Sequence, residues 1–181
     1  MRRKLTWVFV FGAAITGAAA YVGSVFATPA SGFVGATLAL GRFGNIDVRN
    51  HSSPGREGDE DEDDDDGFPR RWLSVQKTKG ASDLYVQSNV WAPGGSTGWH
   101  THPGHSLIIV TAGTVTGYEG DDPSCTPHVY TQGMGFVDPG GEHVHLLRNE
   151  HTIEARTIAV QLIPAGAARR IDAPASTSCP F

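Results

Sequence analysis

The feature that most constrains this fold is a succession of short β-prone runs, cut by glycine and proline, that begins at Trp72. The runs read WLSVQK, DLYVQSNVWA, SLIIVTAG, TVTGY, HVYTQ, MGFVDPGG, HVHLL and TIEARTIAVQLIPAG. Runs of this kind at a spacing of roughly 8 to 12 residues are typical of sandwiches and barrels. No run beyond the N-terminal segment shows sustained helical periodicity. The sequence therefore predicts an all-β fold, and its 181 residues predict one domain.

An acidic segment interrupts the predicted domain. Nine carboxylates lie between Glu57 and Asp66, and almost nothing in residues 51–70 is apolar. Such a composition predicts a disordered, solvated insertion. Specific calcium binding is the alternative, although calcium loops place acidic residues at alternate positions around a glycine turn. Because Gly35 to Gly41 can form a strand before the insertion, we expect residues 28–181 to make one domain.

The N-terminal segment has the pattern of an export signal. Arg2, Arg3 and Lys4 precede a run from Leu5 to Ala27 that carries no charge. This pattern predicts a signal helix over residues 1–27, with cleavage after Ala27, and a secreted or extracytoplasmic protein. An uncleaved anchor formed by residues 5–27 is the alternative, since 23 uncharged residues suffice to cross a membrane.

The charge and the cysteine content restrict which kinds of partner the protein can bind and in which cellular compartment it is expected. Without residues 1–27 the chain has 11 Lys and Arg against 19 Asp and Glu, a net charge of −8, which argues against nucleic acid as a partner. Its two cysteines, Cys125 and Cys179, predict one disulfide in an exported protein. Two free thiols are the alternative.

Histidines are concentrated in the middle of the chain. Six of the eight lie in one stretch, at His100, His102, His105, His128, His143 and His145. In an extended strand residues i and i+2 project to the same side, so both rings of each His-x-His pair can reach one point. Neutral imidazole suits zinc, copper, iron and nickel. A closed barrel would bring the two pairs together. His51, His128 and His151 stand outside this pattern and are predicted at the surface.

The spacing around these pairs resembles the two motifs of the cupin superfamily. In the first motif, five residues separate Gly94 from His100 and one separates His100 from His102. Three residues then precede Ser106, and six more precede Gly113. In the second motif, five residues separate Gly133 from Pro139 and one separates Pro139 from Gly141. Three residues lie between Gly141 and His145, where the family has two, and three more lie between His145 and Asn149.

The resemblance implies a double-stranded β-helix, or jelly-roll barrel. It also implies that His100, His102 and His145 are ligands of a divalent transition metal ion, with Fe, Mn, Zn, Cu and Ni not distinguished. Ser106 occupies the place of the family's glutamate ligand, which is a departure from the pattern. His105, Ser106 and His143 are candidates for an additional ligand or for a supporting role. A metal-free polar pocket is the alternative.

Two classes of function remain open on the sequence. The first is a metal-dependent enzyme, an oxygenase or isomerase acting on a small molecule, as cupins often are. The second is a small-ligand or metal-binding module without turnover, which the missing glutamate favours. Catalytic residues are not assigned, although Glu119 and Glu142 lie near the motifs. Trp91 and Trp99 either fill the core or wall the mouth of the barrel. The sequence does not indicate an oligomeric state.

Overall fold

A computed structural model describes residues 27–52 and 72–181 of this chain. All regular elements in these two ranges are β-strands, which confirms the all-β prediction. Most of the predicted signal helix and of the acidic insertion lies outside the described residues. Within the described ranges, no helix is long and apolar enough to cross a membrane.

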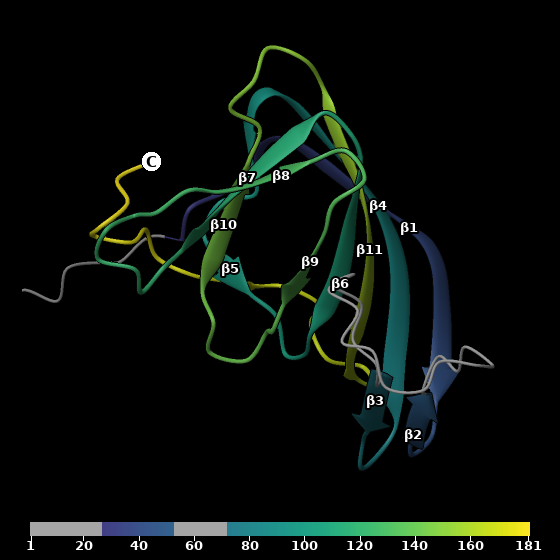
Figure 1. Cartoon of the computed structure of the whole chain (residues 1–181). Helices are drawn as coiled ribbons and strands as arrows, with labels where there is room; N and C mark the ends of the chain where they lie inside the picture. Colours follow the sequence, from purple (N-terminus) through teal and green to yellow (C-terminus); the bar gives the residue numbers. More distant parts are fainter. Residues whose placement is uncertain (1–26, 53–71) are drawn as a thin grey trace, which may run out of the picture.

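The strands form two antiparallel layers that face each other (Figure 1). The first layer has the order β1 (Ser31–Phe43), β4 (Ser82–Ser96), β11 (Ala155–Pro164), β6 (Ser106–Ala112) and β9 (Gly135–Asp138). The second has the order β8 (His128–Thr131), β7 (Thr114–Glu119), β10 (His145–Arg148), β5 (His100–Thr101) and β12 (Ile171–Asp172). The layers join where Arg148 pairs with Ser96. The result is a nearly closed antiparallel barrel, consistent with a cupin jelly roll.

The strand expected near the N-terminus is present and is longer than predicted. β1 pairs with β4 from Ser31 to Phe43, with two register shifts, so it is an integral part of the first layer. A separate hairpin follows, made of β2 (Asp47–Ser52) and β3 (Trp72–Lys77). His51 and Ser52 were expected in the acidic insertion, but they lie in β2 because they pair with Leu73 and Trp72.

The core lies between the two layers because alternate side chains of the strands point inward. In β6, Ser106, Ile108 and Val110 are buried, whereas the intervening residues are exposed. One cluster of buried side chains contains Trp91 and another contains Trp99. Both tryptophans are at most 1% exposed, so they fill the core. Trp91 also lines a cavity described below.

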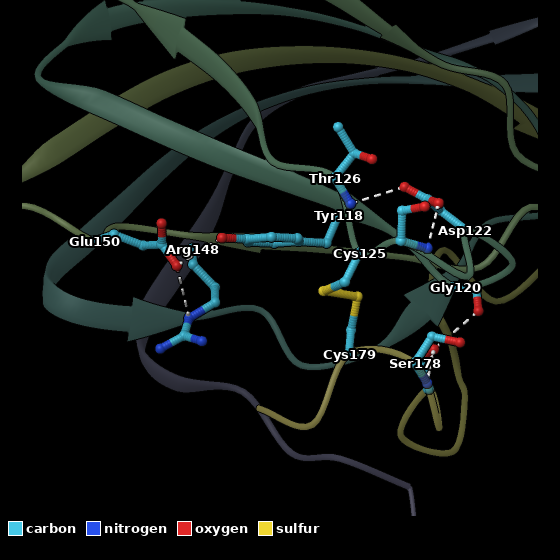
Figure 2. Close-up of a disulfide and its surroundings, with 11 residues drawn as sticks. Tyr118, Gly120, Asp122, Cys125, Thr126, Arg148, Glu150, Ser178 and Cys179 are labelled. Atoms are coloured by element: carbon cyan, nitrogen blue, oxygen red, sulfur yellow. Dashed lines mark hydrogen bonds and ion pairs between the residues drawn. A yellow bond between two sulfur atoms is a disulfide. The ribbon is translucent and has the colours of Figure 1, made fainter.

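A disulfide between Cys125 and Cys179 fastens the C-terminal tail to the loop after β7 (Figure 2). The two Cα atoms are 5.3 Å apart. The loop is shaped by Asp122, whose carboxylate accepts hydrogen bonds from the backbone N–H groups of Ser124 and Thr126 at 2.8 and 2.7 Å. The predicted pairing is therefore present in the structure.

Candidate metal site

Three histidines from the two motifs converge between the layers. His100 in β5 and His145 in β10 are direct cross-strand partners, so their side chains emerge on the same face of the sheet. Their ring centroids are 4.4 Å apart, and the ring of His102 lies 4.8 Å from His100 and 5.5 Å from His145. One ligand nitrogen from each of the three lies within 4.8 Å of the others. The structure therefore brings together the three residues that the resemblance implied as ligands.

Two glycine turns place these strands. Gly98, just before β5, has a φ of +68°, and a Cβ atom there would lie 2.2 Å from the carbonyl oxygen of Thr28. Gly140 also has a φ of +68°, and a Cβ atom there would lie 2.2 Å from the carbonyl oxygen of Gly104. Only glycine satisfies both the backbone angle and the close approach. The loop before β10 is then held against β5, because the Gly141 N–H donates to the His102 carbonyl at 2.7 Å.

Backbone carbonyls orient two of the rings. The Nδ1 of His100 donates to the carbonyl of Gly98 at 2.9 Å, and the Nδ1 of His102 donates to the carbonyl of Arg169. With the proton on Nδ1, each Nε2 carries a free lone pair, which is the form that binds a metal ion. The Nδ1 of His145 lies 3.4 Å from the carbonyl of His143, a longer contact.

Burial keeps the three imidazoles neutral. Desolvation, followed by the charges of His145 and Arg170, lowers the pKa of His100 from 6.5 to about 2. Desolvation also lowers the pKa of His145, to about 4, and that of His102 in the same direction. At neutral pH all three imidazoles are therefore uncharged, each with one ring nitrogen free of a proton, and the donor set fits the divalent ion that the cupin resemblance implies.

A cavity of about 190 Å³ opens beside the three rings. Its walls include the amides of Gln87, Asn89 and Gln161 and two arginines, Arg169 and Arg170. The guanidinium of Arg169 is held over the Tyr85 ring, 4.4 Å from its centroid, and bonds Gln161 and Gln87. Arg170 pairs with Asp172 through Nε, but its Nη2 is buried without a hydrogen-bond partner in the described residues. The cavity therefore has a polar wall with an excess of positive charge.

Asp138 is the site residue that sequence reasoning missed. It is 4% exposed, and its carboxylate oxygens lie 3.5 Å from His102 Nε2 and 3.6 Å from His145 Nδ1. The only signal in the sequence was its place directly before Pro139 of the second motif. Arg169 and Arg170 were also missed, because they lie beyond both motifs and reach the cavity from the segment between β11 and β12.

The additional candidates have different surroundings. Ser106 is buried, lines the same cavity and donates to Asp138 Oδ2 at 3.3 Å. A ligand atom of His143 lies within 4.8 Å of those of Asp138 and His145, but His143 Nε2 is 2.6 Å from the Glu119 carboxylate. His105 lines a different cavity, next to the β2–β3 hairpin.

The remaining polar residues near the motifs do not contribute to this cluster. Glu142 is exposed, whereas Glu119 is half-buried, and burial raises its pKa. The three histidines predicted at the surface, His51, His128 and His151, are all exposed.

Residues 90–161, which contain both motifs, match the family model of the Cupin domain. This part of the chain is a cupin domain, as the resemblance implied. A search of curated proteins gives no match.

Among solved structures, the chain is similar to the polyketide cyclase RemF from Streptomyces resistomycificus, with 19% identity over 52% of this chain and 63% of that chain and a TM-score of 0.44. It is also similar to a protein with a double-stranded β-helix domain from Klebsiella pneumoniae, with 20% identity over 50% of this chain and 74% of that one and a TM-score of 0.42. A cupin domain from Bordetella pertussis has 21% identity over 44% of this chain and 80% of that one, with a TM-score of 0.38.

Proposed function

We propose that this cupin-domain protein binds a divalent transition metal ion through His100, His102 and His145. The observation that carries the proposal is the convergence of three neutral imidazoles, two of them buried and that of His102 half-buried, with backbone carbonyls orienting His100 and His102. Here the Nδ1 protons of His100 and His102 are used on backbone carbonyls, which leaves two Nε2 lone pairs for an ion.

The adjacent cavity is the proposed binding place of a small molecule. Its volume of about 190 Å³ is below the roughly 300 to 1,000 Å³ typical of pockets for drug-sized ligands, so the ligand is small. The amide groups of the wall offer both donors and acceptors, and Arg170 Nη2 is a buried donor without a partner. An unpaired buried donor is costly unless a ligand satisfies it. These features favour a polar molecule that carries an acidic or carbonyl oxygen.

For the reaction we propose oxygenase or isomerase chemistry on that molecule. His100, His102 and His145 would hold the divalent ion, which would supply a Lewis acid for an oxygen of the bound molecule. The chain's own contribution is to orient the molecule through Arg170 and the amides, and to exclude water through Trp91 and Phe33 in the cavity wall.

The alternative is a binding module without turnover. One specific observation favours it, because Ser106 stands where the family motif has a glutamate ligand. Oxygen uptake and product analysis with a panel of small carboxylic acids distinguish the two. Saturable binding to the metal-loaded protein without any conversion supports the module.

The test of metal binding is elemental analysis of the protein purified without chelators, and again after incubation with Fe, Mn, Zn, Cu or Ni salts. We expect one ion per chain, and its loss in His100→Ala, His102→Ala and His145→Ala. The matched controls His51→Ala, His128→Ala and His151→Ala remove exposed histidines and should keep the ion. Melting curves confirm that each variant is folded. A wild-type protein that takes up none of these ions would refute the proposal.

We also propose that the protein acts outside the cytoplasm, in a secreted form or anchored by residues 5–27. The uncharged run after Arg2, Arg3 and Lys4 supports this, and so does the disulfide, because such bonds persist in oxidising compartments. N-terminal sequencing of the exported protein tests it. A first residue of Thr28 would establish cleavage, and an intact N-terminus in the membrane fraction would establish the anchor.

A further inference from the structure

We propose that Asp138 supplies the carboxylate ligand of the metal site, in place of the glutamate that the cupin motif carries at the position of Ser106. This inference rests on the proposed function and extends it. In this chain the carboxylate stands on β9, directly across from the position on β6 where the motif has its glutamate, and it approaches the site beside His102 and His145.

The register of two strands explains how the replacement works. β6 and β9 are antiparallel, and Ser106 is the direct partner of Asp138. Side chains of such partners lie on the same face of the sheet, with Cβ atoms about 4.5 to 5.5 Å apart. A carboxylate on Asp138 therefore reaches the region that a longer side chain would reach from Ser106. The Ser106 hydroxyl, which replaces the glutamate, now donates to Asp138 Oδ2 at 3.3 Å and holds it in this place.

The contact between Asp138 and His102 points to a cation between them. His102 has its proton on Nδ1, where the Arg169 carbonyl accepts it, so Nε2 is an acceptor. This acceptor faces the Asp138 Oδ2 atom, also an acceptor, at 3.5 Å. Two acceptors at this distance repel each other. Ligand atoms about 2.1 Å from a shared ion stand about 3.0 to 3.4 Å apart in octahedral and tetrahedral sites, so a shared ion accounts for the spacing.

The charge balance of the surroundings leads to the same conclusion. Asp138 is 4% exposed, and within the described residues its only ion-pair partners within 4 Å are His102 and His145. In the described residues no lysine or arginine side chain lies within 4 Å of this carboxylate, so it faces no permanent cation. A buried charge without a counter-ion is unfavourable. A divalent ion beside Asp138 supplies that counter-ion, and the carboxylate lowers the charge of the three-imidazole site from +2 to +1.

The Gly140 N–H, which donates to Asp138 Oδ1 at 2.9 Å, makes a sharp test possible. Asp138→Asn keeps an oxygen for this bond and for His145, and it removes the charge. Ser106→Glu restores the motif's carboxylate at the first position, where the side chain can extend into the cavity. The matched control is Asp121→Asn, an exposed residue of the loop after β7.

The measurement is the affinity of the full chain for Co²⁺, by competition with a chelator, together with the visible spectrum of bound Co²⁺. We expect Asp138→Asn to weaken binding at least about tenfold and to shift the spectrum, because a charged ligand is lost. Asp138→Asn combined with Ser106→Glu should recover most of the affinity. Asp121→Asn should behave as the wild type.

Four outcomes distinguish the further inference from the proposed function. Unchanged affinity and an unchanged spectrum in Asp138→Asn overturn the inference and leave the three-histidine site standing. A second outcome also overturns it: Asp138→Asn loses affinity for Co²⁺, and the double variant with Ser106→Glu folds but does not recover that affinity. Asp138 would then act by orienting His145. If the double variant does not fold, the Co²⁺ spectrum of Asp138→Asn alone decides. A wild type that binds no Co²⁺ refutes the proposed function itself.

Discussion

Removal of the disulfide should cost this protein a large part of its stability. Cys125 and Cys179 are separated by 54 positions in the sequence. For a loop of this length the loop-entropy relation gives about 4 kcal/mol at 25 °C. A domain of 150 to 250 residues loses roughly 2 to 4 °C of Tm per kcal/mol, so we expect the Tm to fall by about 8 to 16 °C.

The choice of substitution follows from the surroundings of the bond. Cys179 is fully buried and belongs to the cluster of Trp99, Tyr118 and Leu146. A serine there would bury a hydroxyl among apolar side chains and add a penalty of its own. The double variant Cys125→Ala, Cys179→Ala avoids this penalty and removes both thiols.

The assay is thermal unfolding followed by circular dichroism, with and without a phosphine reductant. Reduction should lower the Tm of the wild type toward that of the double-alanine variant, and it should leave the variant unchanged. Equilibrium unfolding in urea gives the loss in free energy directly. A decrease in Tm below about 3 °C would refute the reasoning, since it would mean that the tail adds little constraint to the unfolded chain.

Two further predictions concern a turn and an ion pair. A non-glycine residue in the left-handed conformation costs about 1 to 2 kcal/mol of folding free energy. Gly140→Ala should cost more than this, because the new Cβ atom also collides with the Gly104 carbonyl. Gly133→Ala, at a φ of +90° with open space around it, is the control in urea unfolding, and equal losses would contradict the collision. Asp83 is bonded by Arg42 and by the Gly166 N–H, which lower the pKa of Asp83 from 3.8 to about 2. Because the pKa of Asp83 is lower in the folded state, its ionised carboxylate stabilises the protein above about pH 4, and this contribution is lost as the pH falls toward 2. The urea midpoint of Asp83→Asn should therefore depend less on pH between 4 and 2 than the midpoint of the wild type does.

The sequence was sufficient for the local and periodic features of this protein. The all-β architecture follows from strand-like runs and turn residues, and β6 shows the alternation of buried and exposed side chains that such runs predict. The resemblance to the cupin motifs, carried by the spacing from Gly94 to His100 and from His145 to Asn149, selected His100, His102 and His145 from eight histidines. The disulfide needed only a count of two cysteines.

Strand pairing decided which further residues stand beside the three histidines. It brings together residues that lie far apart in the chain and belong to no common sequence motif. Asp138 enters the site only because β9 lies beside β6, 32 residues away in sequence, with Ser106 and Asp138 in register. His105 is one residue from Ser106, yet it lines the cavity beside the β2–β3 hairpin, since neighbouring side chains of an extended segment point to opposite sides. His51 and Ser52 join a strand although the acidic segment follows them directly, because Leu73 and Trp72 offer them partners. Arg169 and Arg170 reach the cavity from the segment before β12, where Asp172 pairs with His100. The sequence determined which histidines converge between the two layers, and the tertiary structure decided which carboxylate and which cations stand beside them.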